Sequence, residues 1–218
     1  MIFIVGDIHG EFDHFWHDIE KAIDIHGIPD AIIQVGDFGY YTTEMLHWKN
    51  PTKIPVYFVD GNHEEFSYLP PTNGEIVEVR PELWYVPRGT VLELWGKKFA
   101  FCGGGESVDK AWRKKDISWF AEERVTDEDI QRTIKNSLGQ KIDYLITHVP
   151  PISVIHTHFP KIDKNYWGLP DDWKDVSAMK IQALWDGMGN PNIIFGHMHS
   201  SIKGPNYQLL DCGEVLVV

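Results

Sequence analysis

Short apolar runs alternate with a helical pattern in the first part of the chain. Three runs rich in β-branched residues predict buried strands at residues 1–5, 31–35 and 55–59. Between the first two runs, apolar residues recur with helical spacing and predict a helix over 11–25. A shorter helix is expected over 43–49. This alternation predicts a βαβαβ unit with a parallel sheet.

The middle of the chain has a different pattern. Four short apolar runs separated by turn residues predict antiparallel hairpins, which form a second sheet or extend the first. They cover residues 76–79, 83–86, 90–95 and 98–102. A helix is expected over 126–136, with Thr126 as its N-cap and acidic residues in its first turn.

The last third returns to an α/β pattern. Its expected elements are strands at 142–146 and 192–195, a helix at 177–185, and a closing hairpin formed by 207–210 and 214–218. The polar, proline-rich stretch 155–172 is expected to be a long loop. No repeat or linker interrupts the sequence, so one domain over residues 1–218 is predicted.

The composition is that of a globular protein. Hydrophobic residues make up 43% and charged residues 24% of the 218 positions. No run approaches the ~18 apolar residues that span a bilayer, and no secretory signal is visible. Cys102 and Cys212 are too few for a disulfide framework, and both lie in apolar runs. A cytoplasmic protein with two buried free thiols is expected.

The charge balance is acidic, with a formal net charge of −12. A groove that follows a nucleic-acid backbone normally carries a basic surface, so nonspecific nucleic-acid binding is disfavoured. Bound divalent cations would offset part of the negative charge locally. A small phosphorylated substrate or a nucleotide therefore stays compatible with the composition.

Metal-binding residue types follow five of the predicted strands. They are Asp7 and His9, Asp37, Asn62 and His63, His148, and His197 and His199. Each alone is explained as a turn or loop residue, but open α/β sheets place ligands at the carboxyl ends of their strands. Oxygen and imidazole donors together suit Mn, Fe, Zn or Ni better than an all-oxygen Mg or Ca site. Two such ions about 3.5–4 Å apart can hold the attacking and leaving oxygens of a phosphate.

Five motifs in this order resemble those of the calcineurin-like metallophosphoesterases. They are residues 6–10 (GDIHG), 36–39 (GDFG), 61–64 (GNHE), 147–151 (THVPP) and 196–199 (GHMH). The resemblance implies an α/β fold in which two mixed β-sheets pack as a sandwich flanked by helices. The helices and the two sheets would form four layers, and the βαβαβ unit would be the core of this arrangement.

The resemblance also implies the role of each site residue. One metal ion would be held by Asp7, His9, Asp37 and His199. The second would be held by the bridging Asp37 together with Asn62, His148 and His197. A hydroxide bridging the ions would attack phosphorus, and His63 would protonate the leaving oxygen or stabilise its charge. Manganese is the favoured metal, with iron, zinc and nickel as alternatives.

One position departs from the family pattern. Family members often carry an Asp three residues after the bridging one, where it supports the catalytic His. Here that position is Tyr40. The Glu64 carboxylate or the Tyr40 hydroxyl is the expected replacement for this support of His63.

The segment 103–124 is the candidate for substrate contacts and is similar to an element of small phage and bacterial phosphoesterases. It begins with three glycines, which permit close backbone approach to a ligand. Ser107, Lys110 and Arg113 are candidate contacts to phosphate. A flexible connection with a solvated basic face is the alternative.

The sequence thus predicts a metal-dependent hydrolase acting on a phosphomonoester or a small phosphodiester. The substrate would be a phosphorylated small molecule, a phosphoprotein or a nucleotide, with no membrane partner. A nuclease or cyclic-nucleotide phosphodiesterase on the same site is the alternative. An inactive scaffold is disfavoured because every ligand position of both metal sites is filled. The sequence leaves the oligomeric state open.

Overall fold

The computed structural model describes residues 1–71 and 74–218, and within them two six-stranded sheets form the centre of the fold. The first sheet has the spatial order β12 (Val215–Val217), β1 (Ile2–Val5), β2 (Ala31–Gln34), β3 (Val56–Phe58), β5 (Leu83–Tyr85) and β4 (Val77–Arg80). Strands β1, β2, β3 and β5 are parallel, whereas β12 and β4 run antiparallel at the two edges.

The second sheet repeats this plan. Its spatial order is β10 (Ile202–Lys203), β11 (Tyr207–Leu209), β9 (Asn192–Phe195), β8 (Tyr144–Thr147), β7 (Lys97–Cys102) and β6 (Val91–Leu94). Strands β11, β9, β8 and β7 are parallel, and β10 and β6 are antiparallel edges. Both sheets are therefore mixed, as predicted.

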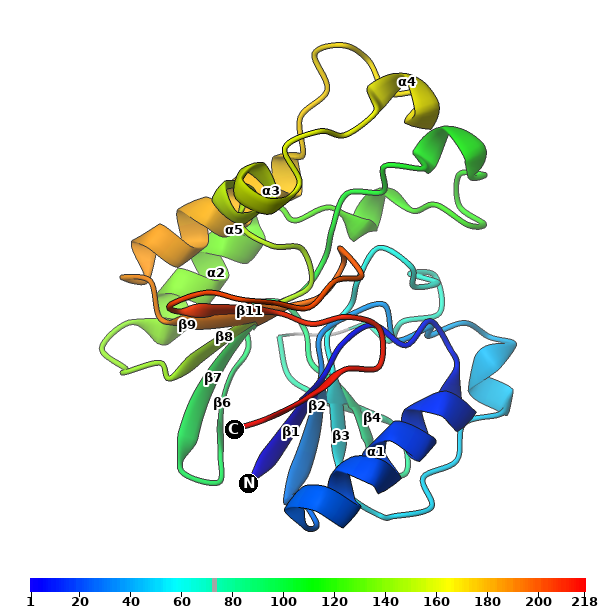
Figure 1. Ribbon diagram of the computed structural model, residues 1–218, viewed down its shortest axis with the longest axis vertical. Coiled ribbons are helices and arrows are strands. Elements are labelled where there is room, and N and C mark those ends of the chain that lie inside the picture. Colours follow the sequence, from blue (N-terminus) through cyan, green and yellow to red (C-terminus); the bar gives the residue numbers. More distant parts are fainter. Residues whose placement is uncertain (72–73) are drawn as a thin grey trace.

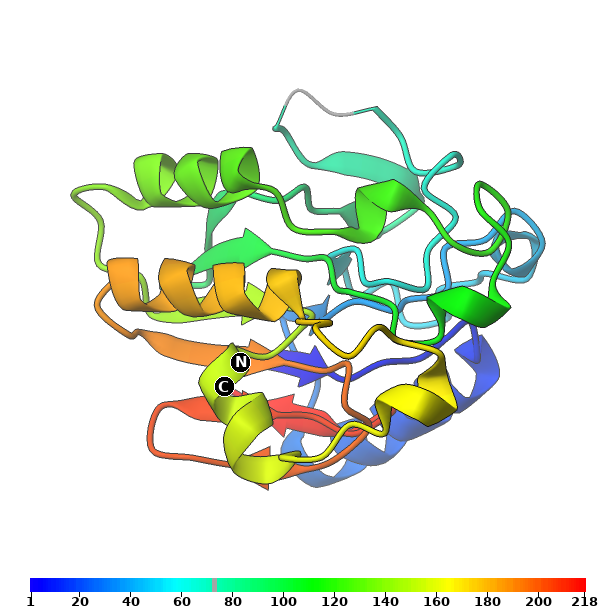
Figure 2. The same ribbon diagram turned by 90° about the horizontal axis from the view of Figure 1, so that it is seen from above.

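The two sheets pack face to face and helices cover their outer faces (Figure 1). Ile4 and Val35 of the first sheet share a buried cluster with Phe99 and Phe101 of the second. Helix α1 (Phe12–His26) packs on the outer face of the first sheet. Helices α2 (Asp127–Ser137) and α5 (Val176–Gly187) lie side by side over the second sheet (Figure 2). The predicted helix–sheet–sheet–helix sandwich is confirmed.

The predicted hairpins of the middle region divide between the sheets. Strands β4 and β5 extend the first sheet, and β6 and β7 begin the second, so both predicted outcomes occur. The predicted helix after Thr126 is present as α2. Its N-terminus has reciprocal bonds: the Thr126 hydroxyl accepts from Asp129 N at 3.1 Å, and the Asp129 carboxylate accepts from Thr126 N at 2.9 Å.

The predicted closing hairpin is wrong. Strand β11 pairs in parallel with β9 in the second sheet, whereas β12 pairs antiparallel with β1 in the first. The chain between them crosses from one sheet to the other, and the hairpin partner of β11 is the unpredicted two-residue strand β10. Apolar runs identify strands, but the partner of a strand depends on which sheet edge is free in the folded chain.

Three smaller predictions also need correction. The helix expected over 43–49 is a single 3₁₀ turn, η1 (Glu44–Leu46). The loop expected over 155–172 contains α4 (Lys164–Trp167) and most of α3 (Ile152–His158). Cys102 is buried as expected, but Cys212 is exposed because it lies in the crossing between the sheets. Among the described residues, no helix has the length and apolar character that a bilayer crossing requires.

Candidate metal centre

Both sheets contribute to one site. The motif loops follow β1, β2 and β3 of the first sheet and β8 and β9 of the second. At this junction the ring nitrogen Nδ1 of His148 lies 3.1 Å from the carbonyl oxygen of Val35, which directly follows β2. The packing of one sheet on the other therefore brings together donors that lie far apart in the sequence.

Four of the predicted ligands form a group that we call the outer half of the site: Asp7, His9, Asp37 and His199. Donor atoms of these four side chains all lie within 4.8 Å of one another. The Nε2 atoms of His9 and His199 are 3.0 Å apart, and Asp7 Oδ2 lies 3.3 Å from His199 Nε2. Such convergence of two imidazoles and two carboxylates is typical of a transition-metal site.

The remaining predicted ligands surround His148 and form, with Asp37, the inner half of the site. His148 Nε2 lies 3.0 Å from Asn62 Oδ1, 3.2 Å from His197 Nδ1 and 3.3 Å from Asp37 Oδ1. The other oxygen of Asp37, Oδ2, lies 3.9 Å from His9 Nε2 in the outer half. Asp37 thus presents one oxygen to each half.

The backbone at four of these residues adopts a conformation that is uncommon for residues other than glycine. The φ angles are 47° at His9, 52° at Asp37, 71° at His197 and 44° at His199. Such outliers often occur at functional sites, where surrounding contacts hold them in place. Here His63 N donates to Asp37 Oδ1 at 2.7 Å, and His197 N donates to Asp7 Oδ2 at 3.0 Å.

A glycine in the third motif permits this close packing. A Cβ added to Gly61 would lie only 2.1 Å from Asp37 Oδ1. No other residue fits there without displacing the carboxylate that serves both halves. The glycine of the GNHE motif therefore has a steric role in the site as well as a turn role.

The electrostatics of the site favour positive charge where the donors meet. Burial opposes ionisation of Asp37, yet His148 holds the pKa of this carboxyl well below its usual range. Burial also opposes a charge on His148, but Asp37 and Asp7 raise the pKa of its imidazole to about 9. Burial lowers the pKa of His197 to about 3, and the neighbouring His148 adds to this effect. Buried carboxylates that hold a proton on a neighbouring imidazole suit a cation at this position.

The comparison with known families agrees with this geometry. The model of the family described as calcineurin-like phosphoesterase matches residues 1–201. The chain belongs to this family. No curated protein sequence matches the chain. The matched range includes all five motif loops, and members of the family typically bind two metal ions.

His63 of this family member lies beside the outer half of the site. Its ring is 5.0 Å from the ring of His9, measured between centroids. The contact to His63 comes from Arg113, whose Nη2 lies 2.5 Å from Nε2 and 3.1 Å from Nδ1. Burial lowers the pKa of His63, and the guanidinium lowers it further against the opposing charge of Asp37.

Glu64 and Tyr40, the expected supports of His63, have other roles. The Glu64 carboxylate accepts hydrogen bonds from Phe38 N at 2.8 Å and Tyr40 N at 2.6 Å. It thereby ties the loop after β3 to the turn that carries Asp37. The Tyr40 ring is buried and stacks on Phe58. The structure places Arg113 against His63 instead.

The three candidate substrate residues have different surroundings. Ser107 is buried, and its hydroxyl donates to Glu123 Oε2 at 2.7 Å. The Lys110 ammonium lies 3.8 Å from the centre of the Trp119 ring, a cation–π distance. Arg113 contacts His63 and also donates to the carbonyl of Asn62 at 3.2 Å. Of these three side chains, that of Arg113 contacts His63 directly.

The triple glycine permits close approach between parts of the protein. A Cβ on Gly103 would lie 2.4 Å from the carbonyl oxygen of Asp60. The chain after β7 therefore packs directly on the loop that follows β3, which carries Asn62 and His63. This packing makes the segment 103–124 a wall of the site.

Several buried contacts beside the site had no sequence signal. Arg88 is buried and bonds to Asp60 Oδ2 through both Nε, at 2.9 Å, and Nη2, at 2.5 Å. Its guanidinium also donates to the carbonyls of Glu122 and Glu123, at 2.9 and 3.0 Å. Burial opposes the charge, but Asp60 raises the pKa of Arg88 above its ordinary value. Neither Arg88 nor Glu123 lies in a motif, so only their burial identifies them.

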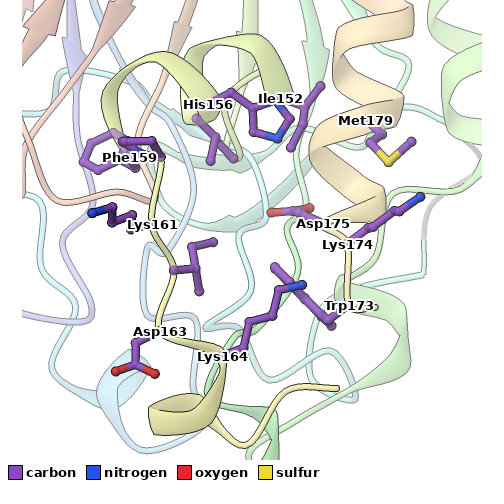
Figure 3. A pocket seen from close by; sticks show the side chains of 13 residues that line it. Ile152, His156, Phe159, Lys161, Asp163, Lys164, Trp173, Lys174, Asp175 and Met179 are labelled. Atoms are coloured by element: carbon purple, nitrogen blue, oxygen red, sulfur yellow. The ribbon is translucent and has the colours of Figure 1, made fainter. Parts of the chain in front are cut away.

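A separate cavity of about 880 Å³ lies between α3, the chain that follows it and the start of α5 (Figure 3). It contains none of the predicted ligands. Asp175 lines it and accepts from Ala178 N at 2.8 Å, capping α5. Burial raises the pKa of Asp175 to about 7. The cavity is therefore distinct from the metal centre.

Proposed function

We propose that this chain is a dinuclear metal-dependent phosphoesterase that hydrolyses a phosphomonoester or a small phosphodiester. The observation that carries the proposal is the placement of Asp37, with one oxygen in each half of the site. One ion would bind Asp7, His9, Asp37 and His199. The second would bind Asp37, Asn62, His148 and His197. Manganese is the favoured metal, and iron, zinc or nickel also fit this donor set.

Two bound cations would lower the pKa of a water molecule and neutralise charge on the phosphoryl group. The residues of the chain orient and stabilise the leaving oxygen. Arg113 Nη2 lies 2.5 Å from Nε2 and 3.1 Å from Nδ1 of His63, and a guanidinium can only donate, so this contact favours a neutral His63 ring. The low pKa of His63 favours this neutral ring. His63 and Arg113 would then stabilise negative charge on the leaving oxygen through hydrogen bonds.

The outer half provides access for the substrate. The side chain of His199 is 51% exposed and that of His9 is 29% exposed, whereas His148 is fully buried. A phosphorylated small molecule, a phosphoprotein or a nucleotide can therefore approach from the outer side. The formal charge of −12 argues against a long nucleic-acid substrate.

A substrate panel tests the proposal. Hydrolysis of an aryl phosphate monoester, a bis-aryl diester and 2′,3′-cyclic nucleotides is measured with Mn, Ni, Zn and Mg. We expect hydrolysis of at least one ester with a transition metal, and a loss of at least about 10³-fold in the Asp37→Asn variant. Unchanged rates in the variant would contradict the proposal. Two equivalents of bound metal per chain would favour an enzyme over an inactive scaffold, and none after metal-replete preparation would favour the scaffold.

Hydrolysis of a cyclic nucleotide or a nucleotide end at the same site is a second candidate function. Trp112, next to Arg113, packs against Tyr166 and Trp167 of α4, with ring centroids 5.3 and 5.0 Å apart. Trp112 is 58% and Tyr166 63% exposed. Exposed aromatic faces near a phosphate site can stack on a base. A preference for cyclic nucleotides over bis-aryl diesters, lost in Trp112→Ala, would favour this function.

A further inference from the structure

The orientation of the Asn62 side chain is fixed by two neighbours. Its Oδ1 lies 3.0 Å from His148 Nε2 in the inner half, and its Nδ2 donates to Ser107 Oγ at 3.2 Å. A half-turn of the carboxamide would exchange oxygen and nitrogen. The amide nitrogen has donors but no lone pair for a cation. Whatever selects the orientation of Asn62 therefore decides whether it can serve as a ligand.

The Ser107 hydroxyl has one proton, which it donates in a hydrogen bond to Glu123. Ser107 Oγ lies 2.7 Å from Glu123 Oε2. The other carboxylate oxygen, Oε1, accepts from Ser107 N at 2.9 Å and from Trp119 Nε1 at 2.8 Å. Two of these partners, Ser107 N and Trp119 Nε1, can only donate. Burial raises the pKa of Glu123, but the hydrogen bonds from Ser107 and Trp119 oppose this effect, and the ionised carboxylate can only accept. Toward Asn62, Ser107 Oγ can therefore only accept a hydrogen bond. The group of Asn62 that can donate this bond is its NH₂.

We infer that Glu123 is a positioning residue for the inner metal ion. It fixes the direction of the hydrogen-bond chain from Asn62 through Ser107, and so turns the oxygen of Asn62 toward His148. The inference rests on the proposed function, because it takes Asn62 to be a metal ligand. It also gives the segment 103–124 a role, namely to support the inner half rather than to contact the substrate through Ser107.

The two ends of this hydrogen-bond chain, Asn62 and Glu123, are held rigidly relative to each other. Arg88 bonds to Asp60, two residues before Asn62, and to the carbonyl of Glu123. Ser107 and Glu123 are 2% and 1% exposed, so water does not compete for these hydrogen bonds. Groups that support metal ligands in this way commonly alter metal affinity when they are replaced.

The isosteric substitution Glu123→Gln reverses the donor-to-acceptor direction of the hydrogen-bond chain. Two N–H donors, from Ser107 and Trp119, require the amide oxygen of the new side chain, so its NH₂ faces Ser107 Oγ. The hydroxyl then accepts from this NH₂, and its own proton is free for Asn62. Asn62 satisfies that proton by presenting its oxygen to Ser107, which turns its NH₂ toward the inner half. The inner ion loses a ligand without any loss of side-chain volume.

Metal titration tests the inference without relying on activity. Chelator-treated protein is titrated with Mn²⁺ in a calorimeter. We expect two sites in the unsubstituted chain, and in Glu123→Gln one unchanged site and one weakened by about 10–100-fold. Glu122→Gln is the matched control, because Glu122 is exposed and adjacent; it should titrate like the unsubstituted chain. Equal affinities in Glu123→Gln and the control would overturn the inference.

A second pair of variants distinguishes a change in the orientation of residue 62 from a general loss of structure. In Asn62→Asp both side-chain oxygens are acceptors, so one faces the inner half whichever way the group turns. The double variant Asn62→Asp/Glu123→Gln restores matched hydrogen bonds, and we expect it to bind the second Mn²⁺ at least as tightly as Asn62→Asp alone. An equal loss from Glu123→Gln in both backgrounds would show a merely structural effect and overturn the inference.

Ser107→Ala covers the case in which Glu123→Gln does not fold. It leaves Glu123 intact and frees the Asn62 amide, and we expect a smaller weakening of the second site. Unchanged binding would contradict the inference. If the unsubstituted chain itself binds fewer than two Mn²⁺ ions, the proposed dinuclear function fails instead. The two failures are therefore distinguishable.

Discussion

The two halves of the metal centre contain similar donors in different surroundings. In the outer half, His9 and His199 are partly exposed and extend from turns with positive φ angles. In the inner half, His148 is fully buried and lies within hydrogen-bonding distance of the Val35 carbonyl, and Asn62 is held by Ser107. The histidines of the outer half are therefore accessible to solvent. The inner half depends on the packing of the protein around it.

The largest expected effect comes from replacing the central inner ligand and comparing it with an outer one. His148→Ala should reduce aryl phosphate hydrolysis by at least about 10³-fold and lower the free energy of unfolding by roughly 2–4 kcal/mol, because it removes a fully buried side chain. His199→Ala should also impair hydrolysis, but it should change the free energy of unfolding by less than about 1 kcal/mol. Rate assays and urea unfolding measure both. Equal stability losses would remove the distinction between the halves.

The two halves should also differ in how fast they lose their metal ions. Because His9 and His199 of the outer half are more exposed than His148, a chelator should extract the outer ion first and leave about one ion per chain for a time. Metal content measured against time of dialysis should show two phases. Simultaneous loss of both ions would mean that the halves behave as one site.

Arg113→Gln tests the group beside the outer half. Removal of the guanidinium should lower kcat by about 10–100-fold without changing metal content, because Arg113 acts on the leaving group. Arg113 lowers the pKa of His63, so its removal should raise that pKa. The limb of the pH–rate profile that reports His63 should then move to higher pH. Lys110→Gln is the control, since Lys110 lies over Trp119 and should leave the limb in place.

The smallest expected effect concerns a buried carboxylate outside both halves. Burial raises the pKa of Asp175 to about 7, whereas an ordinary Asp titrates near ~3.9. Between these values the folded chain keeps a proton that the unfolded chain releases, so stability falls as the pH rises. Asp175→Asn keeps a cap for α5 and should flatten this fall by up to about 1.4 kcal/mol per pH unit. Urea unfolding from pH 4.5 to 7 measures the two slopes, and parallel slopes would contradict the prediction.

The sequence pattern predicted those parts of the fold that depend on local periodicity. The strands before Asp7, Asp37 and Asn62, the helix after Thr126 and the mixed sandwich all have local or family-wide signals. The closing hairpin had an equally strong local signal and was wrong, because the pairing of β12 with β1 depends on a free sheet edge. Exposure of Cys212 was missed for the same reason.

The candidate site shows the same division. The ligand types were visible in the sequence because each follows a strand, and strand ends converge in α/β sheets. The partners of those ligands were not visible. Arg113 reaches His63, and Glu123 reaches Asn62 through Ser107, across long separations in the chain. Such contacts have no fixed spacing, so no motif describes them.

The sequence by itself determined the family, the donor set and the sandwich fold, because these follow from short-range periodicity and from motifs in a fixed order. The tertiary structure alone decided which histidines of the site are buried, which residue contacts His63 and where the segment 103–124 packs. Burial and hydrogen-bond direction depend on how both sheets and this segment pack together. The hydrogen bond from the Ser107 hydroxyl to Glu123 results from that packing, and no local sequence pattern predicts it.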